Sequence, residues 1–145
     1  MSGDSWSGTE FEVDLLGDRR DGSSPGKFVL LVEDDPVIVE MLRDCLVDYG
    51  GFQVLHARTS LEAQEHFDQN VVDGIILDGK LAEDTHDSSE FGGIRVLAYV
   101  QQRNFHGPVV AISGVCSKEL CARGATVALP KSSGMAILGA LLSVL

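Results

Sequence analysis

From residue 27 onward, short and continuously apolar runs alternate with segments whose apolar residues are three or four positions apart. A continuous apolar run is typical of a strand buried on both faces, whereas the wider spacing is typical of an amphipathic helix. Strands that alternate with helices form a parallel sheet with helices on both faces. We therefore predict a doubly wound α/β fold. The predicted strands are residues 28–32, 52–57, 75–77, 109–112 and 125–129.

Capping residues mark where two of the intervening helices begin. Asp35 is a preferred N-cap residue, and Pro36 suits the first helical position. Thr59 and Glu62 have the spacing of a capping box, which predicts a helix from residue 60. The other predicted helices are 94–105, a short one at 117–123, and 134–145.

Polar residues follow four of the five predicted strands. Glu33 and Asp34 come after the first strand, Asp78 after the third, Ser113 after the fourth and Lys131 after the fifth. The carboxyl ends of parallel strands meet at one edge of a sheet, where ligands of such folds bind. We therefore expect these five residues to share one crevice.

Several carboxylates in one crevice favour a bound cation. Two like charges ~4 Å apart repel by about 4 kcal/mol at an effective dielectric constant of about 20. Such groups either share protons or hold a cation, and oxygen ligands with open positions suit Mg²⁺. A carboxylate is also a nucleophile toward phosphorus, and a nearby lysine and hydroxyl can bind phosphoryl oxygens. The set predicts transfer of a phosphoryl group to an aspartate.

The composition of the chain argues against nucleic acid and membranes as partners. The chain has 145 residues, which suits one domain, and 22 acidic residues against 11 Lys and Arg give a net charge of −11. Such a chain lacks the basic face that nucleic-acid binding needs. No apolar run is long enough for a membrane span, and no secretion signal opens the chain. The three cysteines lack metal-ligand spacing, so we expect a reducing, cytoplasmic setting. They are Cys45, Cys116 and Cys121.

Residues 1–26 differ from the rest of the chain. They are rich in Gly and Ser, and their six acidic residues against two arginines give a net charge of −4. This composition predicts a flexible acidic extension. The folded domain is then expected to span residues 27–145, and we expect no output domain to follow it.

The motifs at the ends of the predicted strands resemble those of the receiver domain of bacterial two-component response regulators. The resemblance covers the chain from about residue 27 to the end, and it implies a flavodoxin-like strand order of 2-1-3-4-5. The motifs that carry it are VLLVEDDP (29–36), IILD (75–78), VVAISG (109–114) and PK (130–131).

The resemblance implies a metal site beside the phosphoryl acceptor. By position, Asp78 is the phospho-acceptor, and Asp34, Asp78 and the backbone carbonyl of Lys80 are ligands of Mg²⁺, with Mn²⁺ as an alternative ion. Glu33 completes the acidic pocket and would reach the metal through water.

The resemblance also implies how the domain signals. Ser113 would be the switch hydroxyl, and Lys131 would pair with the phosphate. The protein would be a single-domain response regulator that receives its phosphoryl group from a sensor histidine kinase or a histidine phosphotransfer protein. It would act by changed association with a downstream protein. It would not be an enzyme beyond its own phosphorylation and dephosphorylation.

Two departures from the family pattern, in and just after the fifth strand, favour a second function, and the last helix departs from the pattern as well. Ala128 stands where the family usually has an aromatic residue, and Pro130-Lys131 replaces the usual Lys-Pro order. The last helix carries no charged residue from 135 to 145, which indicates either a homodimer through this helix or one modestly exposed face. The alternative function is a receiver-like interaction module that signals without phosphate.

Two further alternatives concern the segment after the third strand. A phosphatase of the haloacid dehalogenase type needs an Asp-x-Asp pair, which Asp78-Gly79-Lys80 lacks. The acidic loop beyond it could form a second metal site, but it has no fixed ligand spacing, and we expect it to be solvated. Its polar residues are Glu83, Asp84, His86, Asp87 and Glu90.

Overall fold

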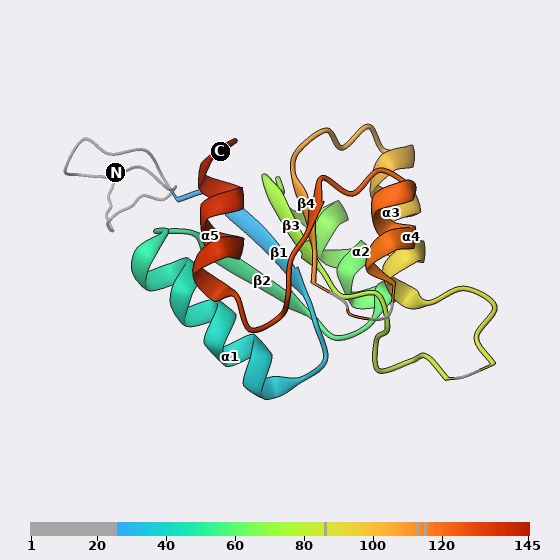
Figure 1. Cartoon of the computed structure of the whole chain (residues 1–145). Helices are drawn as coiled ribbons and strands as arrows, with labels where there is room; N and C mark the ends of the chain where they lie inside the picture. The colour runs from blue at the N-terminus through green and yellow to red at the C-terminus, as the bar shows by residue number, and fades with distance from the viewer. Residues whose placement is uncertain (1–25, 86, 113, 115) are drawn as a thin grey trace.

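The computed structural model describes residues 26–85, 87–112, 114 and 116–145. Except for Gly26, the predicted extension lies outside the described residues, as does Ser113. The described part forms a five-stranded, all-parallel sheet in the order β2-β1-β3-β4-β5 (Figure 1). This confirms the predicted fold and strand order. The strands are β1 (Phe28–Val32), β2 (Gln53–Ala57), β3 (Gly74–Leu77), β4 (Val109–Ala111) and β5 (Val127–Ala128).

Helices cover both faces of the sheet. Helices α1 and α5 lie on one face, and α2, α3 and α4 lie on the other (Figure 1). No helix in the described ranges is long and apolar enough to cross a membrane. The helices are α1 (Pro36–Asp44), the π-helix η1 (Cys45–Tyr49) that continues it, α2 (Ser60–Gln69), α3 (Gly92–Gln102), α4 (Ser117–Ala122) and α5 (Gly134–Leu142).

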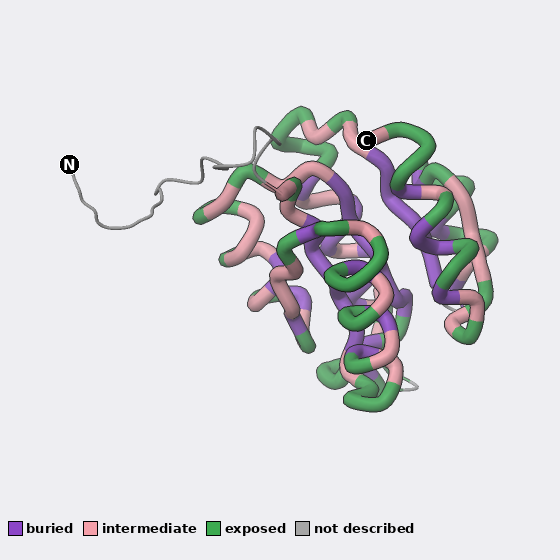
Figure 2. The backbone as a smooth tube through the Cα atoms, turned by 90° about the vertical axis from the view of Figure 1, so that its left-hand side faces the viewer, coloured by how far each residue is buried: buried purple, intermediate pink, exposed green. Residues whose placement is uncertain are grey.

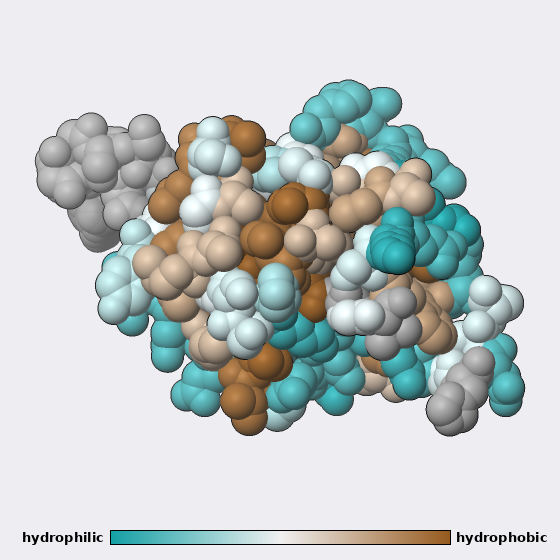
Figure 3. All heavy atoms as spheres, viewed as in Figure 1, coloured by the Kyte–Doolittle hydropathy of each residue, from teal (hydrophilic) through white to brown (hydrophobic). Residues whose placement is uncertain are grey.

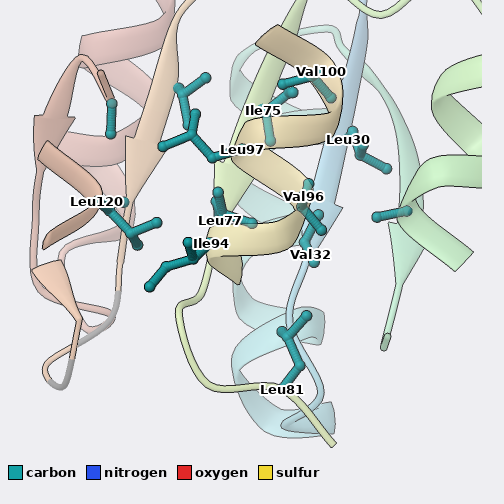
Figure 4. Packing of buried hydrophobic residues seen from close by; sticks show 14 of the residues in the cluster. Leu30, Val32, Ile75, Leu77, Leu81, Ile94, Val96, Leu97, Val100 and Leu120 are labelled. Atoms are coloured by element: carbon teal, nitrogen blue, oxygen red, sulfur yellow. The ribbon is translucent and has the colours of Figure 1, made fainter. Parts of the chain in front are cut away.

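Two hydrophobic cores lie on opposite sides of the sheet. Successive side chains of a strand point to opposite faces, so Leu30 and Val32 enter one core while Val29 and Leu31 enter the other. In the tube view, the central strands β1, β3 and β4 are buried and the outer sides of the helices are exposed (Figure 2). Figure 4 shows the core under α3, where Leu97 faces the strands. Burial on both faces explains why β1, β3 and β4 are continuous apolar runs in the sequence.

The helix boundaries agree with the capping signals. The Asp35 carboxylate accepts a hydrogen bond from the Val37 backbone at 2.9 Å, and the Thr59 hydroxyl accepts one from the Glu62 backbone at 3.2 Å. Helix α4 is short, as predicted. Helix α3 begins at Gly92, two residues before the predicted start, and α5 ends at Leu142, three residues before the predicted end.

Candidate functional site

Residues from three strand ends line an open pocket of about 430 Å³ at the carboxyl edge of the sheet. Hydrogen bonds between neighbouring strands extend one residue past their ends: the Asp78 backbone donates to the Val32 carbonyl and the Glu33 backbone to the Ala57 carbonyl, both at 3.0 Å. These bonds place Glu33 and Asp78 side by side. The pocket is lined by Glu33, Asp34, Asp35, Asp78, Lys80, Leu81, Ala82, Asp84, Gly114 and Lys131.

Glu33 is a fully buried carboxylate at the base of this pocket. Its Oε2 accepts hydrogen bonds from the backbone N–H groups of Asp34 and Asp35, each at 3.0 Å. Burial raises the pKa of Glu33 to about 7, and the Asp78 charge also raises it, whereas the Asp35 backbone and Lys131 oppose the rise. The Glu33 side chain is therefore held by the chain itself, and the pocket without a cation does not fully compensate its ionised form.

Lys131 joins the two buried carboxylates. Its Nζ lies 2.9 Å from Asp78 Oδ2 and 3.0 Å from Glu33 Oε1, and a third of its side chain remains exposed, 33%. Burial lowers the pKa of Lys131, but its bonds to Asp78 and Glu33 outweigh burial, so the pKa is raised overall. Lys131 is therefore charged at neutral pH and partly neutralises the site.

The charges that remain suit a divalent cation. Glu33, Asp34 and Asp78 each place one carboxylate oxygen within 4.8 Å of the others. Three carboxylates and one ammonium group leave two net negative charges at the pocket when all four are ionised. Hard oxygen ligands at an open, water-accessible pocket are the donor set that Mg²⁺ prefers. The residues present therefore fit a magnesium ion.

The predicted site residues are brought together to the extent that the structure describes them. Glu33, Asp34, Asp78 and Lys131 all line the pocket, and Lys80 lines it beside Asp78. The predicted switch hydroxyl, Ser113, lies outside the described residues.

Two histidines that the sequence analysis did not assign to the site support its backbone. His56, on β2, places its Nε2 2.8 Å from the carbonyl oxygen of Glu33. His66, on α2, in turn places its Nε2 2.9 Å from the His56 carbonyl oxygen. The sequence did contain a signal for this role, because His56 is a polar residue near the carboxyl end of β2, and β2 pairs with β1, which ends at the acidic residues. The register pairs His56 with Leu31, two residues before Glu33, and the strand order alone does not fix this register.

The prediction of a solvated acidic loop is wrong for Asp84, and Glu83, although exposed, is held by specific partners. Glu83 accepts hydrogen bonds from the backbone N–H and the hydroxyl of Ser60, both at 2.6 Å, and it pairs with Arg95. Asp84 is buried, with its residue 9% exposed. Glu90 forms an exposed ion pair with Arg123 at 3.3 Å. The sequence did not reveal these structural carboxylates, because the partners of Glu83 are distant in sequence and those of Asp84 have no regular spacing. Within the same loop, Asp87 is exposed, and His86 lies outside the described residues.

We expect Glu83→Gln to destabilise the protein in a pH-dependent way. Burial raises the pKa of Glu83, but the bonds from Ser60 and Arg95 outweigh it, so the folded-state pKa lies below the ordinary 4.5. The stabilisation is therefore present above about pH 4.5 and is lost as pH falls through the folded-state value. At pH 7, we expect a loss of about 1–2 kcal/mol in the free energy of unfolding, measured by urea denaturation.

The difference between Glu83→Gln and the native protein should shrink toward the lowest pH at which the native protein stays folded. Glu119→Gln is the matched control, because Glu119 forms only an exposed pair with Arg123 and its removal should cost less than about 1 kcal/mol. If Glu83→Gln lost as much free energy of unfolding at that lowest pH as at pH 7, the result would contradict the role of the Glu83 charge.

The comparison with known families agrees with this geometry. The chain matches the family model of the response regulator receiver domain over residues 29–141. The chain belongs to the response regulator receiver family. Receiver domains are components of two-component signalling systems, and phosphorylation and magnesium are typical of the family. No curated protein matches the chain at a significant level.

Solved structures of other receiver domains share the fold. The signal receiver domain of a putative LuxO repressor protein from Vibrio parahaemolyticus is 21% identical, with a TM-score of 0.68 over 81% of this chain and 88% of that one. The chemotaxis protein CheY4 from Vibrio cholerae is 26% identical, with a TM-score of 0.67 over 83% of this chain and 99% of that one. The receiver domain of the Francisella response regulator 1452 is 20% identical, with a TM-score of 0.67 over 81% and 95%.

Proposed function

We propose that this receiver domain accepts a phosphoryl group on Asp78 and signals by a changed association with other proteins. The observation that carries the proposal is the placement of the buried Asp78 carboxylate 2.9 Å from Lys131 Nζ, beside two further carboxylates and at an open pocket. A nucleophilic carboxylate, a mobile cation and a metal-binding oxygen set are the groups that phosphoryl transfer to an aspartate needs.

Asp34, Asp78 and the backbone carbonyl of Lys80 would hold Mg²⁺, with Mn²⁺ as an alternative ion and with Glu33 acting through water. When bound, the ion supplies positive charge next to the phosphoryl oxygens and so offsets their repulsion by the carboxylates. Lys80 lines the pocket beside Asp78, which supports this assignment.

The transfer step uses groups of this chain. An oxygen of the Asp78 carboxylate attacks phosphorus, and the bond between phosphorus and the donor nitrogen or oxygen breaks, so that the leaving group takes the electron pair. Lys131 then has a phosphoryl oxygen to bind in place of the Asp78 carboxylate oxygen that it now contacts. Gly114 lines the pocket and has no side chain that could cover Asp78. Ser113 stays our candidate for the switch hydroxyl.

The partners follow from the proposed reaction and from the surface. We propose a sensor histidine kinase or a histidine phosphotransfer protein as the donor, a protein target as the receiver of the signal, and a cytoplasmic setting for this protein. Apolar surface gathers over the α5 side of the molecule (Figure 3). Met135, Leu142 and Val144 are between 50% and 60% exposed there, which supports contact with a partner protein or with a second copy through the last helix.

Phosphorylation is expected to require the divalent cation. The protein should gain one phosphoryl group, seen by intact mass spectrometry, when it is incubated with Mg²⁺ and a small phosphodonor such as acetyl phosphate. With a chelator in place of Mg²⁺ it should gain none, because the carboxylates of the pocket then repel the incoming phosphate.

A protein that gains no phosphoryl group and binds no Mg²⁺ in calorimetry would overturn the proposal. That result would favour the interaction module that signals without phosphate.

A further inference from the structure

The loop between β3 and α3 is closed on itself by one buried carboxylate, that of Asp84. Its side chain is 1% exposed. Its Oδ2 accepts hydrogen bonds from the backbone N–H of Leu81 at 2.8 Å and from that of Gly92 at 2.7 Å. The Asp84 backbone also donates to the Leu81 carbonyl at 3.0 Å. Leu81 and Gly92 are therefore held next to each other, although ten residues separate them.

This closure divides the loop into two parts. The chain leaves the Asp84 carboxylate and returns to it at Gly92, whereas Lys80 and Leu81, on the other side of Asp84, line the pocket. The Gly79 carbonyl accepts a hydrogen bond from the Gly93 backbone at 2.9 Å. Lys80 is therefore flanked by two anchored residues, Gly79 and Leu81, and its backbone has little freedom.

Arg95, on α3, holds the carboxylate in place. Its guanidinium group lies 3.5 Å from Asp84 Oδ1, a buried oxygen that has no hydrogen-bond partner among the described residues. Arg95 also pairs with Glu83 and donates to the Glu90 carbonyl. Because a buried carboxylate is costly without a counter-charge, Arg95 makes the closed loop the stable arrangement.

We propose that Asp84 is a positioning residue for the metal site, which fixes the backbone at Lys80 before the cation binds. This inference rests on the proposed function, in which the Lys80 carbonyl is a metal ligand. Groups that orient metal ligands typically contribute 10- to 100-fold to metal affinity, because the ligand otherwise loses freedom when the ion binds.

The test is the Mg²⁺ affinity of the full chain, measured by isothermal titration calorimetry in 0.15 M salt. Asp84→Asn keeps the size of the side chain but removes its charge, and we expect it to weaken Mg²⁺ binding about tenfold. Asp87→Asn is the matched control, since it makes the same change at an exposed residue of the same loop. The control should bind Mg²⁺ as the native chain does.

Arg95→Gln separates positioning from simple charge. Loss of a cation makes the region more negative, so a purely electrostatic effect would strengthen Mg²⁺ binding. Loss of the group that holds Asp84 should instead weaken it severalfold. The Arg95 side chain is 38% exposed, so its replacement leaves the cores untouched and provides a test even if Asp84→Asn does not fold.

The outcomes distinguish this inference from the proposed function. If the native chain binds Mg²⁺, weaker binding by both variants supports the positioning role. Native affinity in a folded Asp84→Asn protein, or stronger binding by Arg95→Gln, would overturn it while leaving the proposed function in place. A native chain that binds no Mg²⁺ would overturn the proposed function and this inference together. Thermal unfolding without Mg²⁺ shows which variants are folded.

Discussion

Replacing Asp78 by asparagine is expected to abolish phosphorylation of the protein while preserving its fold. The amide is nearly the same size as the carboxylate, and the Asp78 side chain is only 3% exposed, so the packing around it should persist. The amide oxygen can still accept a hydrogen bond from Lys131, but an amide is not a nucleophile toward phosphorus. The transfer step should therefore be lost completely.

The variant should also change the electrostatics of the pocket. The charge of Asp78 is one of the causes of the raised pKa of Glu33. Removal of that charge relieves the repulsion between the two buried carboxylates and should lower the pKa of Glu33. The stability of the Asp78→Asn protein without metal should thus equal or exceed that of the native protein.

The measurement is the intact mass after incubation with Mg²⁺ and a small phosphodonor. Asp35→Asn is the matched control, because Asp35 lines the same pocket and asparagine also caps helices well. We expect the control to gain one phosphoryl group and Asp78→Asn to gain none. A phosphoryl group on the Asp78→Asn protein would place the acceptor on another side chain, with Asp34 the first to examine.

The sequence predicted the three central strands because burial on both faces makes almost every residue of β1, β3 and β4 apolar. It predicted the starts of α1 and α2 because each cap binds a backbone N–H group close to it in sequence. Asp35 binds the N–H two residues ahead, and Thr59 binds the one three residues ahead. The start of α3 was missed because the Gly92 N–H is bound by Asp84, which lies eight residues upstream in an irregular loop. Such a cap has no fixed spacing and leaves no local pattern.

The same reasoning explains which site residues could be predicted. Glu33, Asp78 and Lys131 follow strands, and parallel strands bring their carboxyl ends to one edge whatever the loops do. The roles of Glu83 and Asp84 depend on how the loop folds back onto α2 and α3. The spacing of residues in the sequence does not encode that path. For this reason the sequence predicted a solvated acidic loop.

Gly93→Ala is expected to destabilise the protein although alanine is the better helix former. Gly93 lies in the first turn of α3, against the backbone of the loop that leaves Asp78. A Cβ at this position would lie 2.2 Å from the Asp78 carbonyl oxygen and 2.7 Å from the Gly79 Cα. Both neighbours are backbone atoms, so they cannot rotate away, and either α3 or residues 78–79 must shift.

The expected cost is about 2–3 kcal/mol of the free energy of unfolding, in the range of overpacked interiors. The shift would also disturb the hydrogen bond between Gly93 and the Gly79 carbonyl, next to Lys80. We therefore expect weaker Mg²⁺ binding and slower phosphorylation in the fraction that folds. Urea denaturation gives the stability, and calorimetry gives the affinity.

Gly139→Ala is the matched control, because Gly139 also lies in a helix, α5, and a Cβ there would meet nothing within 4 Å. Helix propensity then acts alone and should stabilise the protein by up to about 1 kcal/mol. The two substitutions are chemically identical, so opposite signs would isolate the contact between α3 and the Asp78 backbone. Equal effects would show that α3 can move away from the acceptor without cost, and the anchoring of residues 79–81 would lose its support.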